Sequence, residues 1–564
     1  MNKKHAINPV FNFTDVRELI EWSSYNYANK TAFSYRSSPR DAECKSVSFS
    51  ELGNEIRALA SRLIEMGCHG KHCILIGKFS YEWALTYYAV LSIGGVLVPL
   101  DKDWSEEELA DTVKKADGAF MFGDYDIADK INGVAEASGI KDVYYLHGNG
   151  DKKALSRLVE AGREVFENAP GLYYNTPVNP LNMALLVFTS GTTGKGKGVM
   201  LSQNAILSDM YNAVHYLDYG KNTIGILPPH HTYGSTIMLI GHNMIGAEVY
   251  ISSGVKYITK ELAEQKPEHL VLVPLYLETF YRKITASLKE KGKLESVTKA
   301  IKATKGLRGM GVDIRKKVFG AIHDVFGGNL KMIICGGAPL SREVFDFYDG
   351  IGISVVNGYG ITECAPIISF NRSKNIIPGS IGNVIDDCFV KIDEPNEDGE
   401  GEILFKGANV MLGYYKDDAA TADAFKNGYF RTGDYGRIGK KGELYITGRK
   451  KNLIILSNGK NVYPEEIENE LSAVPGIIDI VVYEGQSARG LAYNAIVAEI
   501  YPDADYFAKN GIELNEAYFK RYIEEFNKKT VPYKKIGILK LRTEEFPKNT
   551  LRKIMRFKID MTID

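Results

Sequence analysis

Short apolar runs separated by helical patterns constrain the fold more than any other feature of this sequence. The runs occupy residues 73–76, 184–188, 270–273, 332–335 and 354–356. Each is short enough to form one strand buried on both faces. A preceding stretch, residues 52–64, repeats apolar side chains at helical spacing, and Ser50 is its predicted cap. Buried strands that alternate with helices are typical of α/β layers around a mainly parallel sheet.

The pattern changes in the last third of the chain. Residues 390–445 contain short strand-like segments and Gly-rich turns, which indicate a smaller β-rich subdomain. A separate α+β pattern follows, with helices predicted at 464–471 and 513–527 and strands at 478–483 and 495–500. Because 564 residues exceed what one hydrophobic core usually supports, we expect at least two domains. We predict an α/β N-terminal domain over residues 1–449 and a small mobile C-terminal domain over residues 450–564.

Composition narrows the class of protein. The formal net charge is −1, so no global field attracts nucleic acid or an anionic membrane. Six cysteines are too few for a disulfide framework. The longest uncharged apolar stretch, residues 84–100, contains two glycines and a proline and therefore reads as a buried helix followed by a strand. We expect a cytoplasmic protein with no transmembrane segment and no nucleic-acid partner.

One loop carries the strongest chemical signal. Residues 188–199 read F-T-S-G-T-T-G-K-G-K-G-V, and a helix is expected to follow at Ser202. Glycines let backbone N–H groups surround an anion, while hydroxyls and lysines add donors and charge, so the loop predicts phosphate binding. It also approaches the P-loop pattern of nucleoside triphosphatases, but Gly198 stands where that motif needs a magnesium-binding Ser or Thr. A P-loop ATPase or kinase remains an alternative of a different class.

Six further motifs follow this loop. They are L-P-P-H-H at residues 227–231, G-G-A-P-L-S at 336–341, N-G-Y-G-I-T-E at 357–363, G-Y-F-R-T-G-D at 428–434, G-R-K-K at 448–451 and P-K-N-T-L-R-K at 547–553. In this order, the motifs and the loop resemble the adenylate-forming (AMP-binding) superfamily, which includes acyl-CoA synthetases, firefly-type luciferases and nonribosomal-peptide adenylation domains. The resemblance implies that the chain activates a carboxylic acid with ATP to form an acyl-adenylate.

The resemblance implies a role for each motif. The phosphate loop is formed by Thr189, Ser190, Gly191, Thr192, Thr193, Gly194 and Lys197. Residues expected beside adenine and the α-phosphate are Gly337, Ala338, Asn357, Gly358, Tyr359, Gly360 and Thr362. His231 is expected at the mouth of the acyl pocket. Asp434 is expected to accept from the ribose hydroxyls, with Arg449 steadying the nucleotide from the other side.

The reaction itself explains this choice of residue types. A carboxylate is already ionised at pH 7, so forming the adenylate needs no general base. Catalysis then depends on bringing two anions together and on fixed positive charge. Glu363 is the expected Mg²⁺ ligand, because one carboxylate with phosphate oxygens and waters is a usual arrangement. The resemblance implies that Lys553 is the catalytic lysine and that the C-terminal domain swings about Lys451, opening a thiol channel along residues 457–459.

Three positions depart from the superfamily pattern. Gly196 replaces a proline in the phosphate loop, and Leu551 and Arg552 replace a small hydroxyl residue and a glycine before Lys553. These departures leave both lysines in place but change the residues that form the local turns. They are the one feature that favours a catalytically silent binding protein.

The substrate is expected to be a fatty or aromatic acid. No carboxylate follows His231 over residues 232–238, which leaves the ammonium group of an amino acid without a partner. Residues 271–279 resemble the corresponding segment of fatty-acyl-CoA synthetases. Coenzyme A is the expected acceptor, and the basic segment at residues 528–558 is expected to meet its phosphates. The closest alternative is a fatty-acyl-AMP ligase that loads a carrier protein.

Overall fold

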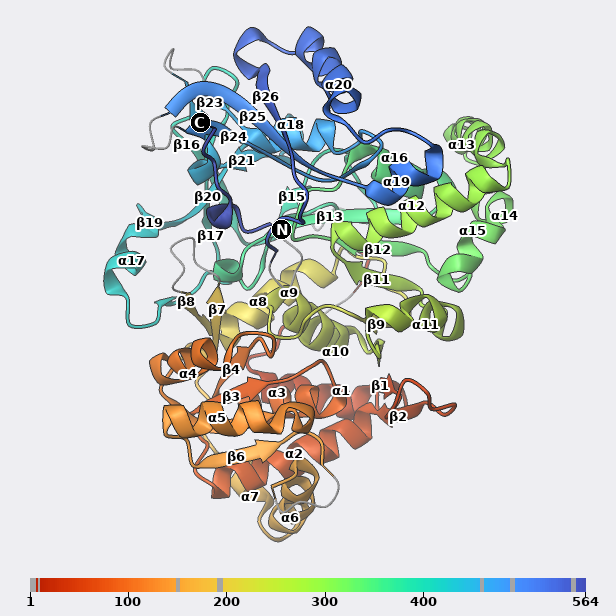
Figure 1. The fold of residues 1–564 in the computed structure, drawn as a ribbon. Coiled ribbons are helices and arrows are strands. Elements are labelled where there is room, and N and C mark those ends of the chain that lie inside the picture. Colours follow the sequence, from red (N-terminus) through yellow and green to blue (C-terminus); the bar gives the residue numbers. More distant parts are fainter. Residues whose placement is uncertain are drawn as a thin grey trace.

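The structure is a computed structural model that describes residues 7–8, 11–148, 153–189, 196–456, 461–486, 492–548 and 554–563, with backbone alone at 492–494. Figure 1 shows the N-terminal helices and strands, in red and orange, at one end of the molecule and the C-terminal elements, in blue, at the other end. The α/β class predicted from the apolar runs is confirmed.

The largest sheet has the strand order β18-β8-β7-β4-β3-β5-β6. Its parallel strands are β3 (His72–Ile76), β4 (Val96–Leu100), β5 (Gly118–Gly123), β6 (Asp142–Tyr145) and β7 (Met183–Thr189). The antiparallel strands β8 (Lys197–Ser202) and β18 (Gly413–Tyr414) extend one edge. Alternate residues of β3 enter two cores, Cys73 and Leu75 one of them and Ile74 and Ile76 the other, so both faces of the sheet are covered.

Seven helices accompany this sheet along the described part of the chain. They are α1 (Val16–Asn26), α2 (Phe49–Glu65), α3 (Tyr81–Ser92), α4 (Glu106–Lys115), α5 (Ala128–Ser138), α6 (Leu155–Asn168) and α7 (Pro170–Asn175). The predicted cap of α2, Ser50, is wrong by two residues. Ser48 caps the helix instead, because its hydroxyl accepts from Glu51 N while the Glu51 carboxylate accepts from Ser48 N. The apolar stretch at residues 84–100 is the end of α3 followed by β4, as predicted.

Two smaller sheets continue the N-terminal part. One has the order β2-β1-β10-β9, with strands Lys45–Ser48, Thr31–Tyr35, Glu248–Ile251 and Asn222–Gly225. The other has the order β11-β12-β13-β14-β15, with strands His269–Leu272, Met332–Cys335, Ser354–Gly360, Ile367–Phe370 and Asn383–Val384. The helices of this region are α8 (Gln203–Val214), α9 (Thr232–Ser235), the π-helix Thr236–Gly241, α10 (His242–Ile245), α11 (Ile258–Gln265), α12 (Pro274–Glu290), α13 (Leu294–Gly309), α14 (Arg315–Val318), α15 (Gly320–His323) and α16 (Arg342–Ile351).

The β-rich texture predicted after residue 390 is a further sheet. Its strands are β16 (Phe389–Asp393), β17 (Gly401–Lys406), β19 (Phe425–Lys426), β20 (Tyr429–Ile438) and β21 (Leu444–Arg449), and α17 (Asp418–Asp423) lies between them in sequence. The chain then forms β22 (Ile454–Ile455), β23 (Asn461–Val462), α18 (Pro464–Leu471), β24 (Ile477–Gln486), β25 (Ala492–Pro502), α19 (Ala504–Asn510), α20 (Glu516–Lys529) and β26 (Ile536–Leu541). These last elements have their own apolar core, while the division at residue 449 stays a prediction.

Candidate active site

The predicted phosphate loop connects two antiparallel strands. Thr189 at the end of β7 pairs with Lys197 at the start of β8, so the loop closes a hairpin. The residues predicted between them, Ser190, Gly191, Thr192, Thr193 and Gly194, lie outside the described residues. Helix α8 does begin after Ser202, whose hydroxyl accepts from Ala205 N, but β8 separates that helix from the loop. A P-loop places a helix N-terminus directly on the phosphates, so this topology argues against the P-loop alternative.

Lys197 and Glu363 are joined through Tyr414. The Lys197 ammonium group lies 4.6 Å from the centre of the Tyr414 ring. The Tyr414 hydroxyl donates to Glu363 Oε1 at 3.0 Å. Burial, and next the Glu363 carboxylate, raise the pKa of Tyr414, so the phenol stays protonated and orients the carboxylate. Sequence reasoning missed Tyr414, because β18 is too short to give a pattern and its partner lies 51 positions away.

The turn that carries Thr362 and Glu363 is held from behind by a buried amide. The Asn409 side chain donates to Cys364 O at 2.8 Å and to Asp209 Oδ1 at 3.0 Å. Ile367 N donates to the same oxygen of Asp209 at 3.1 Å. Burial raises the pKa of Asp209 well above its usual value. These contacts hold the short helical turn Thr362–Cys364 in one position.

Asp434 lies between two of the other predicted residues. The Tyr359 hydroxyl donates to Asp434 Oδ2 at 2.6 Å, and Arg449 Nε lies 3.0 Å from Asp434 Oδ1. The pairing of β20 with β21 places Asp434 directly opposite Arg449. The Asp434 carboxylate raises the pKa of Arg449. A carboxylate has about four acceptor positions, so Asp434 keeps capacity for further hydroxyl donors.

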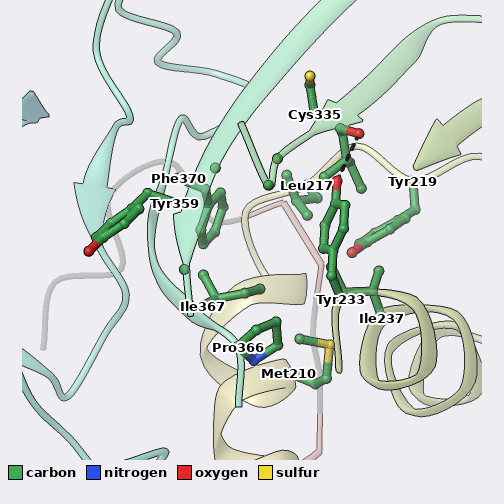
Figure 2. A pocket seen from close by; sticks show the side chains of 15 residues that line it. Met210, Leu217, Tyr219, Tyr233, Ile237, Cys335, Tyr359, Pro366, Ile367 and Phe370 are labelled. Atoms are coloured by element: carbon green, nitrogen blue, oxygen red, sulfur yellow. Dashed lines mark hydrogen bonds between the residues drawn. The ribbon is translucent and has the colours of Figure 1, made fainter. Parts of the chain in front are cut away.

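An apolar cavity of about 70 Å³ opens beside this cluster (Figure 2). The cavity is lined by Met210, Leu217, Tyr219, Tyr233, Ile237, Ile334, Cys335, Gly336, Gly337, Gly358, Tyr359, Gly360, Pro366, Ile367 and Phe370. The predicted residues Gly337, Gly358, Tyr359 and Gly360 are thus brought together. Gly360 has no alternative, because a Cβ there would lie 1.9 Å from Pro366 O. Asn357 pairs with Cys335 in the same sheet, and Ala338 is exposed just beyond Gly337.

One wall of the cavity is fixed by a tyrosine. The Tyr233 hydroxyl donates to Leu272 O at 3.0 Å and lies 3.3 Å from Ile334 O, which are the carbonyls of two neighbouring strands. Burial raises the pKa of Tyr233, so this hydroxyl remains a donor. No Asp, Glu, Lys, Arg or His side chain is among the residues that line the cavity. Its chemistry therefore suits a hydrocarbon or an aromatic ring rather than a charged group.

A cleft of about 1260 Å³ joins the phosphate hairpin to the C-terminal part of the chain. Thr189, Gly196 and His231 line it together with residues on both sides of the predicted catalytic lysine, including Lys548 and Met555. Lys553 itself lies outside the described residues. Burial, followed by the neighbouring His230, lowers the pKa of His231 to about 3. His231 is therefore neutral at pH 7.

The predicted hinge follows the last strand of the β-rich sheet. Lys451 lies in the short 3₁₀ turn Lys450–Asn452, and burial lowers its pKa. The preceding residue, Lys450, forms an ion pair with Glu402 of β17, and its ammonium group lies 2.7 Å from Glu402 Oε2. Residues 457–459, predicted to line a thiol channel, lie outside the described residues.

The residues around Glu363 fit a magnesium ion that is shared with a nucleotide. Among the described residues, no group of three or more His, Cys, Asp or Glu side chains could hold a metal. A single oriented carboxylate such as Glu363 suits Mg²⁺, which commonly takes one or two carboxylates together with phosphate oxygens and water.

The chain is similar to known proteins along most of its length. A family model described as AMP-binding enzyme matches residues 20–415. The long-chain-fatty-acid–CoA ligase FadD15 of Mycobacterium bovis is 30% identical over 459 residues, which are 77% of this chain and 75% of that protein. The long-chain-fatty-acid–CoA ligase 5 of Rattus norvegicus is 27% identical over 542 residues, covering 89% and 78%.

Solved structures share the fold. The ATP-bound MatB of Rhodopseudomonas palustris superimposes with a TM-score of 0.76 at 23% identity, covering 96% of this chain and 97% of that chain. A MenE structure from Bacillus subtilis gives a TM-score of 0.73 at 20% identity, with 96% and 97% covered. No helix in the described ranges is long and apolar enough to cross a membrane. The chain belongs to the AMP-binding (adenylate-forming) superfamily and is an acid–thiol ligase of the AMP-forming acyl-CoA synthetase type.

Proposed function

We propose that the chain activates a fatty or aromatic carboxylic acid to acyl-AMP with release of pyrophosphate and then transfers the acyl group to coenzyme A. The observation that carries this proposal is the position of the apolar cavity. Tyr359 is among the residues that line that cavity, and its hydroxyl donates to Asp434, so the proposed acyl site and the proposed ribose site share one residue. An acid bound in the cavity then has its carboxylate close to the nucleotide.

In the first step, an oxygen of the acid attacks the α-phosphorus of ATP and pyrophosphate leaves. Lys197 and the phosphate loop hold the phosphates, and Thr362 donates to the α-phosphate. Asp434 and Arg449 hold the ribose side of the nucleotide, with Tyr359 against adenine. Mg²⁺ bound at Glu363 would shield the negative charge of the phosphates. Lys553 supplies positive charge where the bond to the leaving group breaks.

In the second step, the coenzyme A thiolate attacks the acyl carbonyl carbon, and AMP leaves. We propose that the C-terminal domain, residues 450–564, turns about Lys451 between the two steps. Lys548 and Met555 line the same cleft as Thr189, which supports delivery of the intervening Lys553 to the first step. His231 is neutral and stands at the cleft, so it contributes a hydrogen bond rather than charge.

A screen of acids with graded length and aromaticity tests the proposal. Purified protein is given ATP, Mg²⁺ and each acid, and the products are measured with and without coenzyme A. We expect equal amounts of AMP, pyrophosphate and acyl-CoA. ADP as the product would support the kinase class instead, and AMP release that responds to an acyl carrier protein but not to coenzyme A would favour the acyl-AMP ligase alternative.

The role of Lys553 has its own test. We expect Lys553→Ala to abolish pyrophosphate exchange and to spare thioester formation from supplied acyl-AMP. Lys520→Ala is the matched control, because Lys520 is an exposed lysine on α20 outside the cleft. Equal loss of both half-reactions in Lys553→Ala would contradict the assignment. We also infer a cytoplasmic location, which localisation of the tagged protein would test.

A further inference from the structure

Helices α13 and α14 are joined by a segment that exposes several apolar side chains. Met310 is 72% exposed, Val312 50%, Val318 45% and Ile314 37%. Single exposed apolar residues are common on protein surfaces, but four within residues 310–318 form a concentrated apolar tip. Figure 1 shows α13, α14 and α15 together at one edge of the molecule. The tip is therefore placed where a large partner can reach it.

The same segment is strongly basic in a protein that is almost neutral. Residues 294–318 contain seven Lys and Arg and two Asp and Glu, a local charge of +5 against −1 for the whole chain. Local charge of one sign attracts a partner of the opposite sign within about one Debye length, roughly 8 Å at physiological salt. The segment thus combines an apolar tip with surrounding positively charged residues.

Some of these cations are already neutralised within the protein. Arg308 pairs with Asp349 at 2.9 Å, Arg315 pairs with Asp313 at 2.6 Å, and Lys299 pairs with Glu295 at 2.6 Å. No ion pair found in the described part of the chain involves the other four cations of the segment. These are Lys302, Lys305, Lys316 and Lys317, and all four are exposed. All four are therefore accessible to an external partner.

The orientation of α13 sets the direction in which two of these lysines point. Thr304 is buried, and a Cβ added to Gly350 of α16 would meet Ile301 at 2.7 Å, so this side of α13 faces the core. At 3.6 residues per turn, Lys302 lies on the face opposite Thr304, and Lys305 lies beside Lys302. The helix therefore presents an uncompensated positive face that continues toward Met310.

We propose that residues 302–318 dock the protein on an anionic lipid surface, with the apolar tip entering the boundary between headgroups and acyl chains. Apolar insertion and basic residues are the two signals that together give stable peripheral binding. A second copy of this chain is a poor occupant, because a two-fold contact would place each positive segment against its own copy. An anionic lipid surface has negative headgroups above an apolar layer. The headgroups match the exposed lysines, and the apolar layer matches the apolar tip.

Sedimentation with lipid vesicles tests this proposal on the full-length protein. The probes are vesicles of phosphatidylcholine mixed with phosphatidylserine, and vesicles of phosphatidylcholine alone. We expect binding to the anionic vesicles and a strong decrease in 1 M salt, where the Debye length falls to about 3 Å. Each lysine near the surface contributes about fivefold, so Lys302→Ala with Lys305→Ala should weaken binding roughly 30-fold. Alanine at these exposed helical positions preserves α13.

The apolar tip and the controls complete the test. Met310→Ser with Val312→Ser should weaken vesicle binding at least tenfold and leave the turnover of a water-soluble acid unchanged. Lys440→Ala with Lys441→Ala removes two exposed lysines elsewhere, and Leu181→Ser removes a side chain that is 64% exposed. Both controls should bind vesicles like the unmodified protein. The proposal is overturned if the protein binds neither vesicle, if tip variants and controls bind alike, or if the tip variants instead abolish self-association.

Discussion

Replacing Asp434 by asparagine tests the proposed nucleotide site most directly. The side chain is only 4% exposed and accepts from Tyr359 and Arg449 at 2.6 and 3.0 Å. Asparagine keeps the shape but loses the charge and exchanges one acceptor oxygen for a donor. If its NH₂ group faces Arg449 Nε, two donors meet. If it faces the Tyr359 hydroxyl, that hydroxyl must accept instead, and its own proton loses its acceptor. We expect Asp434→Asn to weaken ATP binding and to destabilise the fold.

The structure sets the size of both effects. Hydrogen bonds to charged groups are worth about 1.5–3 kcal/mol each. The Arg449 side chain is 37% exposed, so water replaces part of the interaction that it loses with the Asp434 carboxylate. We therefore expect a net destabilisation of about 2–3 kcal/mol. Loss of the proposed charge-assisted bonds to the ribose hydroxyls should weaken ATP binding by about 1.5–3 kcal/mol, which corresponds to a KM for ATP raised roughly 10- to 150-fold.

Two measurements separate these effects. Urea unfolding gives the stability change, and pyrophosphate exchange at saturating acid gives the KM for ATP. Tyr359→Phe removes the hydroxyl that donates to Asp434 and keeps the ring, so the double variant should lose less than the sum of the single losses, with a coupling of about 1–2 kcal/mol. Asp423→Asn, at a side chain 87% exposed, is the control. An unchanged KM for ATP in folded Asp434→Asn would refute the assigned ribose contact.

Three further expectations follow from neighbouring contacts. Tyr414→Phe frees the Glu363 carboxylate and should raise the Mg²⁺ concentration for half-maximal activity about fivefold in a magnesium titration. The pKa of His231 is lowered to about 3, so kcat/KM should show no inflection from this residue between pH 6 and 8, and an inflection lost in His231→Gln would contradict this. Burial opposes ionisation of Glu402, but its hydrogen bond from Lys450 holds the folded-state pKa below 4.5. Its stabilising effect is therefore present at pH 7 and lost as the pH falls below about 4.5, so Glu402→Gln should cost about 1–2 kcal/mol in urea unfolding at pH 7 and little at pH 3.

The apolar runs predicted the sheets well because burial on both faces leaves a direct mark on a sequence. The run at 332–335 is strand β12 at its full length, and the helix predicted at 464–471 is α18. Boundaries set by polar side chains were less certain. Ser50 and Ser48 are both plausible caps, and only the position of Glu51 three residues after Ser48 distinguishes them.

The strand after the phosphate loop was missed for a different reason. Residues 197–202 begin with Lys197-Gly198, which favours a loop, and the following apolar residues fit a helix as well as a strand. Pairing with β7 decides between them, because Phe188 lies opposite Gly198 and Leu186 opposite Met200. Such long-range pairing overrides local propensity.

Contacts behind the predicted motifs also lay beyond sequence reasoning. Asp209 and Asn409 are separated by 200 positions and carry no motif of their own. In the sequence, Asp209 looks like an ordinary polar residue of helix α8. Its role becomes clear only from its hydrogen bond with Asn409, which follows β17. These two residues matter because their hydrogen bonds hold the Thr362–Cys364 turn. Those hydrogen bonds depend on long-range packing, which no local sequence pattern encodes.

Tyr414 contacts both Lys197 and Glu363, so movements of these two residues are coupled. Tyr414 belongs to β18, which pairs with β8 on the edge of the largest sheet, while Glu363 follows β13 of another sheet. The hairpin proposed to bind phosphates and the turn proposed to bind magnesium therefore come from different sheets, and the Tyr414 side chain contacts both. A displacement of the hairpin toward bound phosphates must then move Tyr414 or break its 3.0 Å bond to Glu363. Because Tyr414 contacts both Lys197 and Glu363, the fold itself holds the charges proposed to receive ATP, and we expect little reorganisation during the reaction.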